Sequence, residues 1–315
     1  MNVSAATSWP QGGRHLSRPA FTLLELTIVL MISGVIGAAI GMTLLHQQRF
    51  YRGASDLLYA REGVRDALEV LSTDIRGSSS ADSFRLMADS AIELFSNIGS
   101  SVVCRRLTDL EVGLPAATAR GNTFTALLTQ PDTGDLVLFY RDSLEADSRW
   151  ERHRIAAFGH RSLDASCPAG GPFSPEASDG GPGFVLTLAT PLSPHVAPGA
   201  PVRFIRRGRF SLYRSSNDEW YLGYRRCNAV GPSTCGPVQP VSGPYAGYSS
   251  DPGATGLLFE YVDARGEPVE ASSPIDVARV DITARAVSPG NPTDGGARQG
   301  GDSGKVSLAI RNRLH

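Results

Sequence analysis

Lysine is almost absent from this chain of 315 residues. Lys305 is the only one, and arginine supplies every other permanently charged basic side chain. Acidic and basic residues nearly balance, which leaves a formal net charge of −1 at pH 7. Because a chain that is neutral overall lacks the composition of a general nucleic-acid-binding protein, we do not expect nucleic acid among its partners.

Signatures of the commoner catalytic and cofactor sites are also missing. No P-loop or GxGxxG motif follows a strand-like segment, and no run of oxygen-bearing side chains resembles an EF-hand. No CxxC pair indicates a zinc site. We therefore expect no catalytic residue, no cofactor and no resident metal, and we do not expect an enzyme.

The chain has one long apolar segment, which runs from Phe21 to Leu45. As a helix with a rise of 1.5 Å per residue it would extend roughly 37 Å, enough to cross a hydrocarbon core of about 30 Å with some tilt. With 41% hydrophobic residues, the chain can hold this helix and one sizeable domain, or two small ones. The segment is a candidate membrane span.

Glu25 is the one charged residue within this segment. A carboxylate at the centre of a span costs about 2.5 to 3.5 kcal/mol, and less near the interface. Two interpretations remain open: Glu25 has an electrostatic partner in the membrane, or it lies at headgroup depth without a partner.

The residues around Glu25 carry a family resemblance. Ala20-Phe21-Thr22-Leu23-Leu24-Glu25, followed by about twenty apolar residues, resembles the N-terminal signature of type IV pilins and of the pseudopilins of type II secretion. The resemblance implies that a prepilin peptidase cuts between Ala20 and Phe21 and that the new N-terminus at Phe21 is N-methylated. The family usually has Gly where this chain has Ala20.

The resemblance also implies a role for the acid. Glu25 of one subunit would pair with the free amine of Phe21 on a neighbour, so that two buried charges compensate each other inside an assembly. The implied partners are the prepilin peptidase and N-methyltransferase, other pilins or pseudopilins, and the inner-membrane assembly platform. The implied location is the inner membrane, with a single pass and a periplasmic domain, and then the pilus or pseudopilus, at its tip.

Residues 1–20 fit a cytoplasmic leader, because they include Arg14 and Arg18 and no acid. The alternative is an ordinary secretory signal peptide, but that would be cut after the apolar run, and no A-x-A-like site lies near residue 45. Within the span, Gly37 and Gly41 have the GxxxG spacing that allows close approach of helices in lipid.

Residues 46–77 continue as an amphipathic helix. One face of this helix collects apolar side chains at helical spacing: Leu57, Val64, Leu68, Leu71 and Ile75. We expect this stripe to pack on the following domain, and we expect the helix to end at the glycine and serines after Arg76.

Residues 78–315 form an extracytoplasmic domain rich in β-strands, which makes the fold class α+β, with a long helix on an antiparallel sheet. The predicted strands are 101–107, 123–128, 135–141, 149–158, 184–189, 202–206, 209–214, 220–226, 257–262, 277–287 and 306–311. Two long loops are expected at about 166–182 and 288–304.

Four cysteines, Cys104, Cys167, Cys227 and Cys235, follow the span. An even number outside the cytoplasm suggests two disulfides, for which three connectivities exist. Because Cys227 and Cys235 enclose a turn-rich stretch, we pair them and leave Cys104 with Cys167. Free thiols remain the alternative.

The C-terminal third carries a second, less specific resemblance. Leu257–Gly266 reads LLFEYVDARG, and with the strands over 277–283 and 306–313 it looks like the end of PilW-like minor pilins and of J-type minor pseudopilins. The expected function is therefore that of a minor pilin or pseudopilin that joins or primes assembly. The alternatives are an adhesin or DNA-uptake module that borrows a pilin anchor, and a periplasmic enzyme on a signal anchor.

Overall fold

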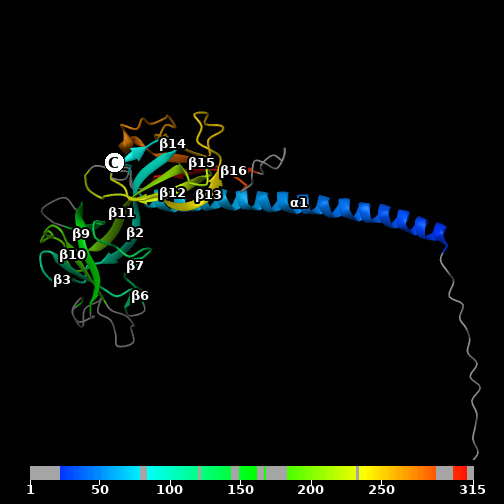
Figure 1. Ribbon diagram of the computed structural model, residues 1–315. Coiled ribbons are helices and arrows are strands. Elements are labelled where there is room, and N and C mark those ends of the chain that lie inside the picture. The colour runs from blue at the N-terminus through cyan, green and yellow to red at the C-terminus, as the bar shows by residue number, and fades with distance from the viewer. Residues whose placement is uncertain are drawn as a thin grey trace, which may run out of the picture. The chain divides into compact units, whose positions relative to one another are not determined.

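The computed structural model describes residues 22–78, 84–119, 122–142, 149–161, 167, 183–231, 234–288 and 301–310 (Figure 1). By internal contacts the chain divides into two units, Met1–Ala54 and Ser55–His315. A single helix, α1, runs from Leu23 to Gly77 over 55 residues and contributes to both units. The predicted leader, the cleavage pair Ala20 and Phe21, and all of the loop predicted at 166–182 except Cys167 lie outside the described residues.

The second unit is built on antiparallel strands. Their bounds are β1 Leu86–Met87, β2 Ala91–Val102, β3 Arg105–Arg106, β4 Glu111–Leu114, β5 Thr118–Ala119, β6 Asn122–Thr123, β7 Ala126–Leu127, β8 Leu136–Arg141, β9 Arg149–Arg161, β10 Gly183–Leu188, β11 Pro201–Arg214, β12 Trp220–Arg226, β13 Gln239–Tyr245, β14 Leu257–Val262, β15 Arg279–Val287 and β16 Gly301–Ala309. All but β5 and β6 belong to one 14-stranded sheet, so the α+β expectation is confirmed at this level.

The strand β11 joins two parts of this sheet. One of its edges pairs with β2 from Pro201 to Ser211. Its other edge pairs first with β8, over Val202–Ile205, and then with β12, over Gly208–Arg214. The strands β9, β10, β4 and β3 continue beyond β8, and β13, β15, β14 and β16 continue beyond β12.

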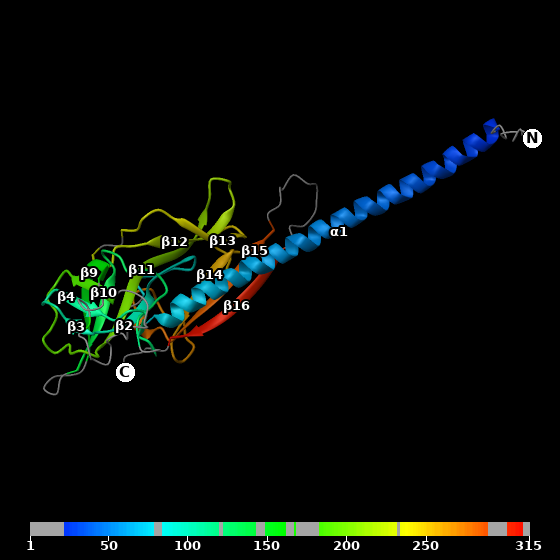
Figure 2. The same ribbon diagram turned by 90° about the horizontal axis from the view of Figure 1, so that it is seen from below.

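The C-terminal half of α1 packs on the β12 side of the sheet. Its buried residues are Ala60, Gly63, Val64, Ala67, Leu71 and Ile75. They share one core with apolar side chains of β2, β11, β12, β14, β15 and β16, and Figure 2 shows this part of α1 beside β14 and β16. The hydroxyl of Tyr245 is buried in this core and donates to the carbonyl oxygen of Gly63 at 2.6 Å.

The predicted apolar stripe needs one correction. Leu57 is 36% exposed and does not join the core, whereas Val64, Leu71 and Ile75 are buried and Leu68 is partly buried. The stripe is completed by the small residues Ala60, Gly63 and Ala67, which a search for large apolar side chains passes over. Small residues let the helix axis approach the sheet closely, since a Cβ on Gly63 would meet the Cβ of Ala286 at 3.5 Å.

A second core fills the β8 side of the sheet, between β8, β9 and β11 and the smaller strands β4 and β10. Phe139, Phe204 and Leu186 are fully buried there. The disulfide between Cys104 and Cys167 borders this part of the molecule. The two cores lie on either half of β11, which therefore connects both.

Several strand predictions need correction. The segments 202–206 and 209–214 form one continuous strand, β11, and the segment 101–107 is divided between the end of β2 and β3. Most of β2, together with β4 and β13, was not predicted from the sequence. The loop expected at 288–304 ends earlier, because β16 begins at Gly301 and pairs along the whole of β15.

Candidate functional site

The start of α1 has a specific local structure. Thr22 precedes the helix, and its hydroxyl oxygen accepts a hydrogen bond from the backbone N–H of Glu25 at 3.2 Å. Thr-x-x-Glu is the pattern of a capping box, in which the threonine and the acid satisfy helix N–H groups that have no intrahelical partner. A carboxylate in the first turn also interacts favourably with the helix dipole. Glu25 thus has a role within its own helix in addition to the role that the family resemblance implies.

The remainder of α1 up to residue 45 is apolar and uncovered. Its apolar side chains are largely exposed; for instance, Leu23 is 81%, Met31 is 75% and Val35 is 72% exposed. Among the described residues this is the one helix with the length and apolar character of a bilayer span, with a mean hydropathy of 2.4 over its best window of 18 residues. Such a surface is stable in lipid or against other apolar helices, and costly in water.

Glycine residues leave one side of this helix open. A Cβ built on Gly34, Gly37 or Gly41 would meet no atom within 4 Å. None of the three is needed for packing within the described chain, although each weakens a helix by about 1 kcal/mol relative to alanine. Their spacing suits close contact with another helix.

Exposed aromatic side chains follow the apolar segment. Phe50 is 73% and Tyr51 is 70% exposed, and Arg49 and Arg52 flank them. Aromatic and arginine side chains are typical of the boundary between hydrocarbon and headgroups. The segment from Thr22 to Arg52 is therefore an apolar helix with a capped first turn. Its other end carries the aromatic and arginine side chains that are typical of a membrane interface.

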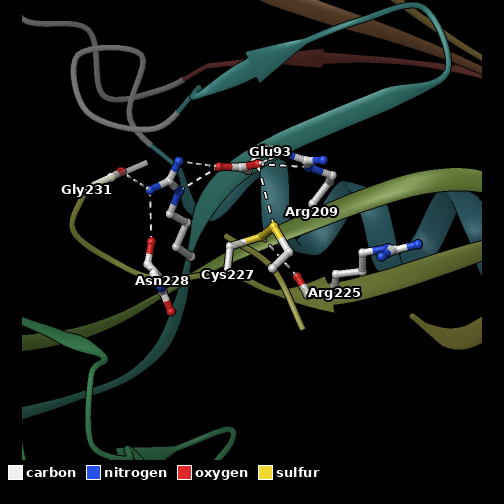
Figure 3. The surroundings of a disulfide bond; sticks show 8 residues. Glu93, Arg209, Arg225, Cys227, Asn228 and Gly231 are labelled. Carbon is white, nitrogen blue, oxygen red and sulfur yellow. Dashed lines mark hydrogen bonds and ion pairs between the residues drawn. A yellow bond between two sulfur atoms is a disulfide. The ribbon is translucent and has the colours of Figure 1, made fainter. Parts of the chain in front are cut away.

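A buried ion-pair cluster lies on the sheet face opposite to the α1 core (Figure 3). Glu93 of β2 is fully buried, and its two carboxylate oxygens accept from the Nε atoms of Arg207 at 2.6 Å and Arg209 at 2.8 Å. The register places Arg209 directly opposite Glu93. One carboxylate thus holds two guanidinium groups, and the cluster keeps a local positive charge.

The disulfide between Cys227 and Cys235 closes a loop over this cluster. The carbonyl oxygens of Asn228 and Gly231 in the loop accept hydrogen bonds from Nη1 of Arg207, at 2.8 and 3.3 Å. Arg207 therefore fixes the loop to the sheet. The two cysteines were predicted as a pair from the sequence, whereas the charged residues beneath them were not.

Three groups in this loop region have the donor types of a metal site, because the ligand atoms of Glu93, Cys227 and Cys235 lie within 4.8 Å of one another. The sulfur atoms are joined in the disulfide, and the carboxylate already holds two arginines. These three groups therefore form a disulfide that lies over a buried ion pair, and their ligand atoms are already engaged.

A second ion-pair cluster lies where β8 and β12 meet along the same edge of β11. Asp135 is 2% exposed and accepts from Nη2 of Arg206 at 2.7 Å and from Nη2 of Arg226 at 3.0 Å. Arg226 also pairs with Asp132, which lowers the pKa of that carboxyl. The cluster ties the two parts of the sheet together and has a structural role.

No family model, no curated protein and no solved structure matches this chain in the three comparisons.

Proposed function

We propose that this chain is a minor pilin or minor pseudopilin that is cut before Phe21 and joins or primes a filament through its N-terminal helix. The observation that carries the proposal is the uncovered apolar half of α1, which begins with a capped acidic turn at Glu25. A helix that only anchors a domain in a membrane needs neither an acid in its first turn nor glycines that leave one side of the helix without side chains.

The proposed assembly step is electrostatic. In lipid, Glu25 near the start of the mature helix attracts a positive group, and the free amine created by cleavage at Phe21 of a neighbouring subunit provides one. The pair forms when the two helices lie side by side with a stagger of about one helical turn. Gly34, Gly37 and Gly41 would let the neighbouring backbone approach closely.

The C-terminal half of α1 supports the proposal in another way. It is packed on a large sheet through a core that includes Val64, Leu71 and Ile75. One helix thus carries both an uncovered apolar surface and a folded domain, as a subunit that projects a domain from a helical assembly requires.

The deciding experiment is mass spectrometry of the N-terminus of the mature chain, isolated from cells that contain a prepilin peptidase. We expect the chain to begin at an N-methylated Phe21. An N-terminus near residue 46 would indicate ordinary secretion, and an intact Met1 would indicate an uncut signal anchor; either result would exclude the proposal.

A further inference from the structure

We propose that the face of the sheet opposite to the α1 core binds the backbone of single-stranded nucleic acid, through arginines and a tryptophan of β9 and β11. This inference is independent of whether the chain joins a filament. The members of this surface, called here the arginine face, are Arg85, Tyr140, Trp150, Arg152, Arg154, Arg203, Arg209 and Arg225.

Strand register places the members from β8, β9, β11 and β12 on one face, and Arg85 lies over the ring of Phe95 on that face. Arg203 of β11 lies opposite Leu138 of β8, and Leu138 in turn lies opposite Arg152 of β9. Arg154 follows two residues after Arg152, so it points to the same side. On the other half of the sheet, Arg209 lies opposite Arg225. Side chains of arginine therefore cover several neighbouring strands.

The positive charge of this face is poorly compensated. In the part of the chain that the structure describes, no carboxylate pairs with Arg85, Arg154, Arg203 or Arg225. Glu93 is the buried acid beneath the face, and it is shared between Arg207 and Arg209. The net charge of −1 of the whole chain thus conceals a strongly basic surface.

Aromatic rings lie among the arginines. The guanidinium of Arg203 is 4.7 Å from the centroid of the Trp150 ring, and Trp150 makes an edge contact with Tyr140 at 5.5 Å. Trp150 is 36% exposed. The guanidinium groups of Arg85 and Arg152 lie over the ring of Phe95, which is buried beneath them. These contacts place guanidinium groups beside aromatic rings on this face of the sheet.

The spacing suits a chain of phosphates. Arg152 and Arg154 are separated by about 6.8 Å along β9, and Arg203 lies about 9.6 Å from Arg152 across two strand intervals. Guanidinium groups bind phosphate oxygens in pairs, and an exposed ring accepts a stacked base. A hollow of about 550 Å³ lies beside the disulfide loop and is lined in part by Arg154 and Asn228. It offers space for a nucleotide next to Arg154.

A single strand fits this surface better than a duplex does. The major groove of a duplex admits a helix or a two-stranded ribbon, whereas the arginine face spreads over more strands than that. An unpaired strand can lie flat on a sheet, with its phosphates on arginines and a base on an aromatic ring. Sequence preference is not expected, because stacking and phosphate contacts carry little base information.

The test uses the full-length chain in an uncharged detergent, with fluorescence anisotropy of a labelled oligothymidine over a series of salt concentrations. The variant Arg154→Gln/Arg203→Gln removes two charges from the face, and Arg65→Gln/Arg76→Gln removes two exposed charges from α1 as the matched control. We expect the face variant to bind roughly tenfold or more weakly and the control within about twofold. The slope of log K against log salt should fall by about 1.4 in the face variant, because each phosphate contact contributes about 0.7.

Trp150→Ala separates stacking from charge. We expect it to weaken oligothymidine binding without changing the salt slope, and thermal unfolding should show that each variant remains folded. Equal losses in the two double variants would overturn the proposal. It would also be overturned if a duplex bound as well as the single strand, or if a sulfated polysaccharide of equal charge displaced the oligonucleotide and Trp150→Ala had no effect.

Discussion

At the scale of single residues, Glu25 combines two possible contributions that substitutions can separate. Within its own helix its backbone N–H donates to the hydroxyl of Thr22, and an N-cap of this kind typically contributes about 1 kcal/mol. In an assembly it would compensate the amine of a neighbouring Phe21, and removing one partner of a buried ion pair costs about 3 to 5 kcal/mol. Glutamine at this position keeps the backbone hydrogen bond to Thr22 but carries no charge.

We therefore predict that Glu25→Gln and Glu25→Val both abolish recovery of the chain in sheared filaments, while membrane insertion is unchanged. Thr22→Val, which removes the cap and keeps the acid, should retain most of the recovery. The measurement is immunoblotting of filament and membrane fractions. If Glu25→Gln were recovered as well as the wild-type chain, the charge of Glu25 would not be needed for assembly.

Asp74, near the end of α1, gives a prediction about pH. Burial raises the pKa of its carboxyl above the ordinary value of 3.8. The folded chain therefore binds the proton more tightly than the unfolded chain does, and folding loses stability as pH rises through the range above 3.8. Asp74→Asn should melt at a higher temperature than the wild type at neutral pH, and this gain should disappear below that range. Asp66→Asn, an exposed position on the same helix, is the control, and an equal gain there would contradict the prediction.

At the scale of elements, the contact between α1 and β16 depends on a glycine. A Cβ on Gly304 would lie 2.6 Å from Cγ1 of Val64 and 3.0 Å from Cδ1 of Leu68, so no larger residue fits without movement. β16 can pass beneath the helix because this position has no side chain.

We predict that Gly304→Val destabilises the domain by about 1 to 3 kcal/mol through overpacking. Gly159→Val in β9 is the matched control, because a Cβ there meets no atom within 4 Å. Thermal unfolding in detergent measures both. Similar melting temperatures for the two variants would show that the helix does not lie this close to β16.

The elements that the sequence predicted well are those whose pattern is local. The predicted strands at 220–226 and 257–262 match β12 and β14. By contrast, β13 reads QPVSGPY, whose prolines and glycine hide a strand, and the first half of β16 contains no apolar residue. β13 is a strand because it pairs mainly with β12, and β16 is a strand because it pairs with β15. A local sequence pattern does not report such pairing.

The candidate sites show the same division. The apolar segment and Glu25 could be identified from the sequence alone, because a single charge within a long apolar run is a feature of consecutive residues. The Glu93 cluster was missed, because its acid and its arginines are separated by more than a hundred residues and meet through strand pairing. An acid inside the apolar stretch AIELF was the available signal.

At the scale of the whole molecule, the net charge of −1 contains no information about where the charges lie on the surface. Register gathers arginines on one face of the sheet, while several acids, among them Asp66, Glu69 and Asp74, lie on α1.

The two units predict how the chain behaves when it is divided. The cores of the structure lie within Ser55–His315. A chain that lacks residues 1–54 should therefore fold without detergent and melt within a few degrees of the full-length chain, which should need detergent to stay dispersed. Circular dichroism and gel filtration measure this, and aggregation of the shortened chain would mean that the first unit is needed for folding.

The first and last described elements of the second unit are neighbours, because β16 passes beneath Val64 and Leu68. The ribosome makes α1 before β16, so the helix is synthesised well before the strand that covers it. A chain that stops just upstream of Gly301 would lack this strand, and Val64 and Leu68 would lose that cover.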